Sequence, residues 1–358
     1  MTTRLQHRST GRVVLSGDGP AFTPAEQARL LSRAIERRNL VPDAYSVGGV
    51  VEELEVRFAR LLGKEQAMFM PTGTLANHLA IRALAGGHGR VAVQEQSHVY
   101  QDCGDAVPSL SGLPLMPLGE GRADFIVDEL QRLIDVTSTG RVGSRVSVLS
   151  IETPVRRAVG RAFDTRELSR VVALARRHDI ALHLDGARLL LQAAYAKRSP
   201  ASIAKPFDTV YVSLYKYLHA PSGAILAGPR RLIAGLRDVR RRFGGALYQA
   251  WPYAALALDA LDGFDARYRK AIAASVRTLA HLDAAGFPVE RVPNGTNRCV
   301  VRLQRGGGER LRRAVERHGI ELPPLDRDGR VTVTVNETWL HQSPRDVADA
   351  FIAARRIR

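Results

Sequence analysis

The chain has 358 residues, of which 45% are hydrophobic and 25% are charged, and its net charge is +16. This length and balance indicate an ordinary globular α/β protein with a second lobe. The apolar runs are too short to cross a membrane, and the N-terminus lacks the apolar core of an export signal, so we expect a cytoplasmic protein without a membrane partner.

Arginine supplies 47 of the 52 basic residues and lysine only five. The arginines are scattered, and no base-stacking aromatic motif accompanies them, so we interpret them as a basic surface rather than a nucleic-acid site. A non-catalytic, arginine-rich binding protein remains the alternative from another functional class. Cys103 and Cys299 lie far apart and show no metal-binding spacing, so no metal site is expected.

Capping signals and apolar periodicity predict the elements of the N-terminal half. Residues 23–26, Thr-Pro-Ala-Glu, form a capping box that predicts a helix to about Arg38. Apolar residues then recur at helical spacing over 51–62. Residues 67–74 are typical of a buried strand, a turn and the start of a new helix, which we expect to run through Leu84. Short strands are expected at 90–93 and 145–151.

The next segments alternate in the same way. Asp164 and Glu167 predict a capped helix over 165–178, and fully apolar strands are expected at 181–185, 208–214 and 224–228. Strands that are apolar throughout, alternating with helices, are typical of a mostly parallel sheet that is covered on both faces. We therefore expect a three-layer αβα domain.

The character changes after Gly244-Gly245. A long helix from about Tyr253 to Ala284 is followed by shorter predicted elements, which indicates a smaller α+β lobe. These elements are a strand at 298–303, a helix near 309–318, a strand at 331–335 and a helix after Pro344. We expect an N-terminal arm and helix at 1–45, a large domain at 46–245 and a small domain at 246–358.

An acid and a lysine follow two of the predicted strands. Asp185 ends the strand at 181–185, and Lys216 comes just after the strand at 208–214. Ligands of open α/β sheets bind beyond the carboxyl ends of strands, so both side chains can face one cavity. Pyridoxal 5'-phosphate needs this pair: a lysine for the Schiff base, and a carboxylate that keeps the pyridine nitrogen protonated.

Two further segments suit the same cofactor. Thr72, Gly73 and Thr74 lie at a strand-to-helix turn, where free N–H groups and the helix dipole can bind a phosphate, although a plain capped helix has the same sequence. His98 follows the strand at 90–93, and its imidazole can stack on a flat ring and exchange protons. A structural histidine is the alternative.

These segments together resemble the threonine aldolase family. The resemblance lies in the phosphate-binding segment at 50–84, the histidine segment QSHVYQDCGDA at 96–106, the aspartate motif HLDGARLL at 183–190 and the lysine segment at 208–228. Four motifs in the right order make it specific, and it covers most of residues 16–250. It implies a fold type I enzyme that binds pyridoxal phosphate in the large domain, with a Schiff base on Lys216.

The resemblance also implies roles for individual residues. Asp185 would pair with the pyridine nitrogen, Gly73 and Thr74 would hold the phosphate, and His98 would stack on the ring. Arg188 would contact the cofactor or the substrate carboxylate. Ser16 falls on a substrate-contacting serine of the family, and Tyr45 falls on a tyrosine near the active site that belongs to the neighbouring subunit.

Several substrate contacts of the family are missing here. Val155 takes the place of its second histidine and Thr153 that of an asparagine, while Thr332 and Tyr248 take the places of two arginines. Arg156 or Arg157 could replace the arginine that grips the substrate carboxylate, although surface placement is the alternative for both. The cofactor site is therefore kept and the substrate site is changed.

The leading hypothesis is a lyase that cleaves the Cα–Cβ bond of a β-hydroxy amino acid to glycine and an aldehyde. His98 would act as the base on the β-hydroxyl. β-Elimination, or another reaction at Cα such as racemisation, on a different amino acid is the alternative. The expected partners are a small amino-acid substrate and further copies of the chain, in a homodimer or homotetramer.

Overall fold

The computed structural model describes residues 11–303 and 308–355. The chain divides into two compact units, and each is described separately. The larger comprises residues 22–262 and 293–296, and the smaller comprises the described parts of 1–21, 263–292 and 297–358. The expected boundary at 245/246 therefore lies inside the larger unit, and the arm that precedes Phe22 belongs with the C-terminal segments.

The larger unit is built on a seven-stranded sheet with the order β2-β8-β7-β6-β5-β3-β4. All its neighbouring strands pair in parallel except β8, which is antiparallel to both β2 and β7. The strands are β2 (Gln66–Met70), β3 (Arg90–Gln94), β4 (Leu115–Leu118), β5 (Val146–Glu152), β6 (Ala181–Asp185), β7 (Thr209–Ser213) and β8 (Ala224–Gly228). The predicted mostly parallel sheet is confirmed.

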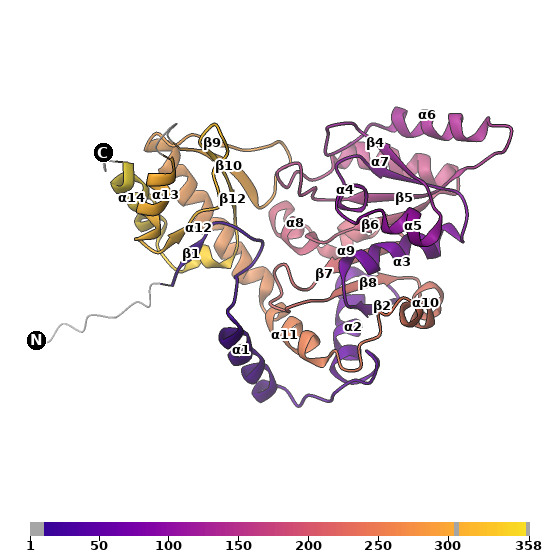
Figure 1. Cartoon of the computed structure of the whole chain (residues 1–358), viewed down its shortest axis with the longest axis horizontal. Coiled ribbons are helices and arrows are strands. Elements are labelled where there is room, and N and C mark those ends of the chain that lie inside the picture. The colour runs from indigo at the N-terminus through magenta and orange to yellow at the C-terminus, as the bar shows by residue number, and fades with distance from the viewer. Residues whose placement is uncertain (1–10, 304–307, 356–358) are drawn as a thin grey trace, which may run out of the picture. The chain divides into compact units, whose positions relative to one another are not determined.

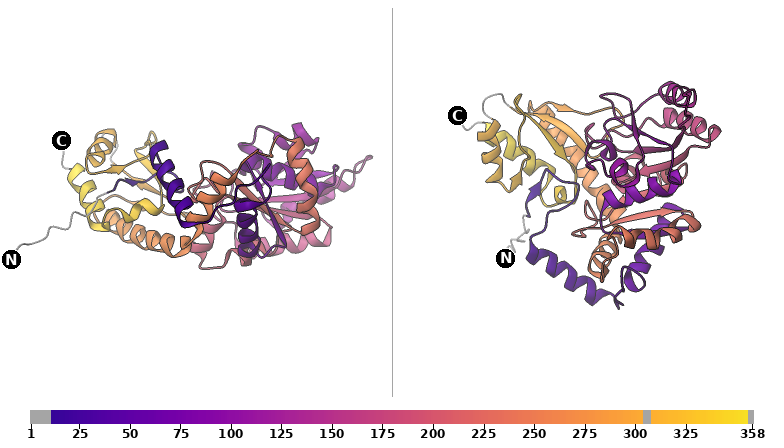
Figure 2. Two further views of the ribbon diagram at one scale, coloured as in Figure 1. Left: turned by 90° about the horizontal axis from the view of Figure 1, so that it is seen from below. Right: turned by 45° about the vertical axis from the view of Figure 1, so that its right-hand side comes forward.

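Helices cover both faces of this sheet (Figures 1 and 2). The helices of the larger unit are α1 (Pro24–Arg37), which packs on α11, α2 (Gly49–Leu62), α3 (Gly73–Ala85), α4 (His98–Gln101), α5 (Ala106–Ser111), α6 (Val127–Ser138), α7 (Thr165–Arg177), α8 (Leu189–Ala196), α9 (Pro200–Ala204), α10 (Arg230–Arg242) and α11 (Trp251–Leu261). On one face, α3 and α10 pack their apolar side chains on β2, β7 and β8. On the other face, α2 packs on β2 and β8, and α7 packs on β6.

The capping box predicted at the start of α1 is present, with both reciprocal bonds between Thr23 and Glu26. Asp164 caps α7 as predicted, because its carboxylate accepts the N–H groups of Arg166 and Glu167 at 2.9 Å. The elements β4 and α6 were not predicted. Leu115–Leu118 has a central proline and alternates poorly, so its sequence gives little strand signal.

The smaller unit has a three-stranded antiparallel sheet of order β12-β10-β9 and a two-stranded parallel pair of β1 and β11. Its elements are β1 (Val13–Val14), α12 (Phe264–Ala284), β9 (Val289–Glu290), β10 (Arg298–Arg302), α13 (Gly308–Glu316), β11 (Ile320–Glu321), β12 (Arg330–Thr334), the 3-10 helix η1 (Glu337–Leu340) and α14 (Pro344–Arg355). One apolar core joins them.

The helical stretch predicted from about Tyr253 to Ala284 is present, but it is not continuous. Two helices, α11 and α12, occupy this stretch, and they are separated at Asp262 and Gly263. Gly263 adopts a left-handed conformation with φ of 69°, which ends helical propagation and which glycine tolerates without steric cost. The division between the two units falls at this same break.

No helix within the described ranges combines the length and apolar character needed to cross a bilayer.

Candidate active site

The predicted cofactor residues gather at one edge of the large sheet. Since β2, β3, β6 and β7 run in the same direction, their carboxyl ends meet at that edge. The segment 72–74 follows β2, His98 follows β3, Asp185 ends β6 and Lys216 follows β7. The topology thus brings together four segments that are far apart in sequence, as the sequence predicts.

Asp185 is a buried hydrogen-bond acceptor with 1% of its surface exposed. Its Oδ2 accepts a hydrogen bond from Asn77 Nδ2 at 2.7 Å, and its Oδ1 accepts one from the backbone N–H of Ala187 at 3.2 Å. Both bonds fix the orientation of the carboxylate. The structure therefore provides a fixed, negatively polarised group at this edge, which suits a protonated ring nitrogen.

The segment predicted to bind a phosphate forms the start of α3. Thr72 caps the helix, because its Oγ1 accepts the N–H of Leu75 at 3.2 Å. Gly73 cannot be replaced by a larger residue without movement, since a Cβ atom there would lie 2.1 Å from Oη of the buried Tyr211. Thr74 follows in the first turn of this 13-residue helix, where N–H groups without an intrahelical partner favour a phosphate.

Two tyrosines accompany the lysine and the acid. Tyr215 contacts Lys216, and Tyr211 lies opposite Asp185 on the neighbouring strand. The Lys216 Nζ donates a hydrogen bond to Tyr215 Oη at 2.6 Å and lies 4.2 Å from the centre of that ring. Tyr211, five residues before the lysine, is paired in register with Asp185. Burial first, and then the charge of Asp185, raises the pKa of Tyr211 well above its ordinary value, so this phenol is neutral at physiological pH. The acid therefore has a neutral neighbour on β7 rather than a second negative charge.

His98 is held by two carboxylates. Its backbone N–H donates to Glu152 Oε2 at 2.6 Å, and its Nδ1 lies 3.5 Å from Asp102 Oδ2. Arg156 and Arg157 also bind Asp102, with Nη2 to oxygen distances of 2.7 and 2.8 Å. The pKa of Asp102 lies well below its usual range, chiefly because Arg157 donates a hydrogen bond to its carboxylate. The two arginines therefore lie next to the candidate base rather than on a remote surface.

Glu152 is a site residue that the sequence did not reveal. It ends β5 in register with Asp185, is 3% exposed, and accepts the N–H groups of His98 and Arg156 at 2.6 and 3.1 Å. Burial first, and then repulsion from Asp185, raises its pKa to about 7. The available signal was an acid at the end of an apolar strand, the same signal that identified Asp185.

Two more residues belong to this group. Arg188 is 5% exposed, directly precedes α8, and lowers the pKa of Glu152 through its charge. The Cys103 Sγ lies 3.9 Å from Thr74 Oγ1. Burial first, and then the charge of Asp185, raises the pKa of this thiol to about 12. Cys103 is therefore a neutral thiol next to the anion site, and it is poorly suited to act as a nucleophile.

The other residues singled out by the resemblance, Tyr45, Ser16 and Thr332, do not belong to the strand ends that form this edge. Tyr45 packs its ring edge-on against Tyr248, with 5.4 Å between ring centres, and lies under the guanidinium of Arg241. Ser16 belongs to the smaller unit, where its carbonyl accepts an N–H from Asn336 at 3.1 Å. Thr332, also in that unit, lies at an exposed position of β12.

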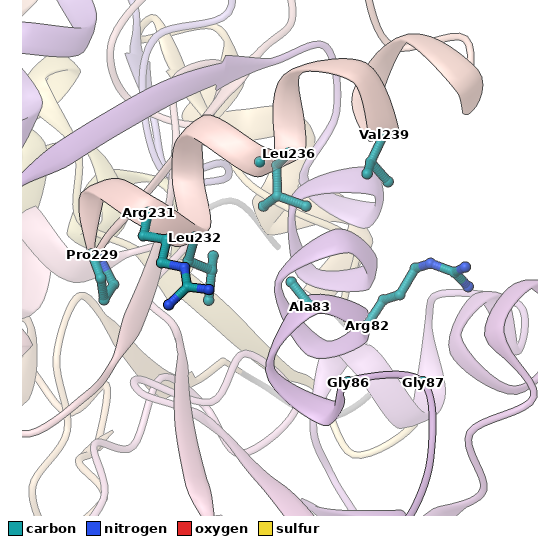
Figure 3. Close-up of a pocket in the computed structure, with 10 residues that line it drawn as sticks. Arg82, Ala83, Gly86, Gly87, Pro229, Arg231, Leu232, Leu236 and Val239 are labelled. Atoms are coloured by element: carbon teal, nitrogen blue, oxygen red, sulfur yellow. The ribbon is translucent and has the colours of Figure 1, made fainter.

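A groove of about 670 Å³ lies elsewhere on the larger unit (Figure 3). It is lined by the last turns of α3, including Arg82 and Ala83, and by Leu232, Leu236 and Val239 of α10. The predicted anion site is at the opposite end of α3, which spans about 20 Å at the rise of an α-helix. The groove is therefore separate from the candidate active site.

Known proteins share this fold and part of this sequence. A crystal structure of a "putative L-allo-threonine aldolase" from Listeria monocytogenes EGD-E superposes with a TM-score of 0.81, at 26% identity, over 97% of this chain and 96% of that one. Low-specificity L-threonine aldolase 1 of Arabidopsis thaliana is 26% identical over 78% of this chain and 80% of its own length. Alanine racemase TOXG of Cochliobolus carbonum is 29% identical over 65% and 59%. Residues 30–305 match the β-eliminating lyase family, and the chain belongs to this family of pyridoxal-phosphate-dependent enzymes.

Proposed function

We propose that this protein binds pyridoxal 5'-phosphate at the edge of the large sheet and cleaves the Cα–Cβ bond of a β-hydroxy amino acid, giving glycine and an aldehyde. The observation that carries this proposal is the convergence of Lys216, the buried Asp185 and the start of α3 at one edge. A reactive amine, a buried acid and an anion site are the three groups that this cofactor requires.

Each of these groups has a distinct role. The Lys216 amine would hold the cofactor covalently, Gly73 and Thr74 would bind its phosphate, and Asp185 would pair with its ring nitrogen. When bound, the cofactor supplies an electron sink for the pair left on Cα as a bond breaks. Arg188 is the buried cation of this group and is the candidate for the substrate carboxylate.

His98 is the candidate base. In retro-aldol cleavage, the β-hydroxyl proton must leave as the Cα–Cβ bond breaks, and an imidazole can accept it near neutral pH. Asp102 Oδ2, 3.5 Å from Nδ1, is placed to stabilise the imidazolium that results. Because Glu152 fixes the His98 backbone, the ring is presented from an anchored position.

Covalent attachment tests the cofactor assignment directly. The purified protein with added pyridoxal phosphate is expected to turn yellow, and borohydride reduction followed by peptide mapping is expected to fix the cofactor on Lys216. Lys216→Ala should remove the label, whereas Lys205→Ala, at another of the five lysines, should keep it. A colourless protein without a label at Lys216 refutes the proposal.

A second reaction on the same site, β-elimination or racemisation, is favoured by one observation. Val155, which takes the place of the family's second histidine, is fully buried, and its backbone N–H bonds to the carbonyl of Arg161 at 2.9 Å. An apolar group there removes one polar contact to a β-hydroxyl. The similarity to an alanine racemase agrees with this alternative. Product assays distinguish the three reactions. Glycine with an aldehyde reports Cα–Cβ cleavage, pyruvate with ammonia reports β-elimination, and D-alanine reports racemisation.

The proposal extends to location and assembly. We propose a cytoplasmic enzyme that works as a homodimer or homotetramer, with an amino acid as its small-molecule partner. Light scattering on the purified, cofactor-loaded chain measures the assembly, and a monomeric mass would contradict this part of the proposal.

A further inference from the structure

Behind Asp185 lies a line of buried polar side chains to which neither the sequence nor the family comparison assigns a role. Asn77 of α3 donates to Asp185, and its Oδ1 lies 2.9 Å from Nε2 of His183 on β6. The Nδ1 of His183 lies 2.8 Å from Oγ1 of Thr209 on β7. Each of these four side chains is at most 1% exposed. The line therefore joins three elements of the fold within the core.

The chemistry of the groups fixes the direction of every bond in this line. A carboxylate only accepts, so Asn77 must turn its NH2 group toward Asp185 and its carbonyl oxygen toward His183. His183 Nε2 must then carry a hydrogen. Burial lowers the pKa of His183 to about 4, so the ring is neutral at pH 7 and its Nδ1 accepts from the Thr209 hydroxyl. All hydrogen bonds thus point from Thr209 toward Asp185.

We propose that Asn77, His183 and Thr209 are positioning residues that aim the Asp185 carboxylate at the ring nitrogen of the bound cofactor. This inference rests on the proposed function, because it presupposes that Asp185 faces pyridoxal phosphate. A buried carboxylate needs hydrogen-bond donors, and a neutral line of aligned donors supplies them without placing a competing cation beside it.

The geometry makes each position specific. Asn77→Leu removes the donor to Asp185 and leaves His183 Nε2 without its acceptor, while keeping a side chain of similar volume. Thr209→Val keeps the shape of the side chain and removes its hydroxyl, whereas Thr209→Ser keeps the hydroxyl. The valine and serine variants form a matched pair at one buried site, so a difference between them reports the hydrogen bond rather than the packing.

The first readout does not require the cofactor. Long-range proton–nitrogen correlation spectra of the full chain are expected to show His183 neutral, with its hydrogen on Nε2, at pH 7. Thr209→Ser should keep this tautomer. In Asn77→Leu, the hydrogen of His183 should no longer be fixed on Nε2. A charged His183, or one with its hydrogen on Nδ1, overturns the proposal.

The second readout is the affinity of the full chain for pyridoxal phosphate, measured by titration of the visible absorbance. Loss of a hydrogen bond to a charged group is expected to weaken binding about tenfold or more in Asn77→Leu. A smaller loss is expected for Thr209→Val, and recovery for Thr209→Ser. Thermal unfolding of each variant checks that the fold survives.

The outcomes separate this inference from the function on which it rests. If the unmodified chain fails to bind pyridoxal phosphate, the proposed function falls, and the positioning role falls with it. If the unmodified chain binds the cofactor and folded Asn77→Leu binds it equally well, only the positioning role is overturned. Equal weakening in Thr209→Val and Thr209→Ser also overturns it, since packing alone would then explain the effect.

Discussion

Replacing Glu152 by Gln is expected to change how the stability of the protein varies with pH. The carboxyl is 3% exposed, and burial followed by the charge of Asp185 raises its pKa from 4.5 to about 7. The folded state therefore binds this proton more tightly than the unfolded chain does. The protonated Glu152 therefore stabilises the folded state fully at a pH below 4.5, its pKa in the unfolded chain. This stabilisation is lost as the pH rises from 4.5 to about 7. The difference corresponds to about 3 kcal/mol in the free energy of unfolding.

Glu152→Gln has no proton to lose in this range. Relative to the unmodified protein, its free energy of unfolding is expected to rise by up to about 3 kcal/mol between about pH 4.5 and about pH 7. The weakened bonds to two backbone N–H groups add an offset of about 1 to 3 kcal/mol that does not depend on pH. The test therefore compares how steeply the free energy of unfolding of the two proteins changes with pH, rather than their stability at one pH.

Urea titrations of the two cofactor-free proteins across this pH range measure the effect. Glu120→Gln, which removes an exposed carboxylate, is the matched control and should change the slope much less. A stability difference between Glu152→Gln and the unmodified protein that stays constant with pH, or that changes in the opposite direction, would refute the reasoning.

Three further substitutions test other parts of the larger unit by urea or thermal denaturation. Gly73→Ala is expected to destabilise the protein by about 2 kcal/mol and to weaken cofactor binding, because its Cβ would clash with buried Tyr211; unchanged stability would contradict this. Asp102→Asn removes a carboxylate that two half-exposed arginines share, so a loss of at most about 1 kcal/mol is expected, and a loss that does not shrink at high salt would count against it. Arg240→Met leaves three carbonyl oxygens without the buried guanidinium that binds them, so a loss of about 3 kcal/mol is expected; a loss below about 1 kcal/mol would show that water replaces it.

Much of the large sheet could be predicted from sequence, because buried parallel strands are apolar throughout and alternate with capped helices. The break at Gly263 was missed, since a single glycine within a helical pattern is also compatible with one continuous helix. The extended conformation of Asp262 and the left-handed conformation of Gly263, which the tertiary structure selects, separate the two helices.

The site could be predicted where a residue type is itself distinctive. Lys216 and Asp185 follow apolar strands, and an amine and an acid at the carboxyl ends of such strands are typical of a pyridoxal phosphate site. Glu152 and Asn77 were missed for different reasons. Glu152 carries the same sequence signal as Asp185, an acid at the end of an apolar strand, but only the strand register shows that it lies beside Asp185. Asn77 lies in the middle of a helix, where an amide usually faces solvent, and only packing of α3 on the sheet reveals its partner.

The polar groups of this site differ sharply in their contact with water. Asn77, His183 and Thr209 are at most 1% exposed, whereas the side chains of Arg156 and Arg157 are 42% and 39% exposed. Amino-acid exchanges at the two arginines disturb few neighbours and cost little stability, while exchanges in the core line cost much more. In the proposed enzyme, substrate preference can therefore change at the outer positions without loss of the cofactor, and a directed-evolution library has its widest freedom there.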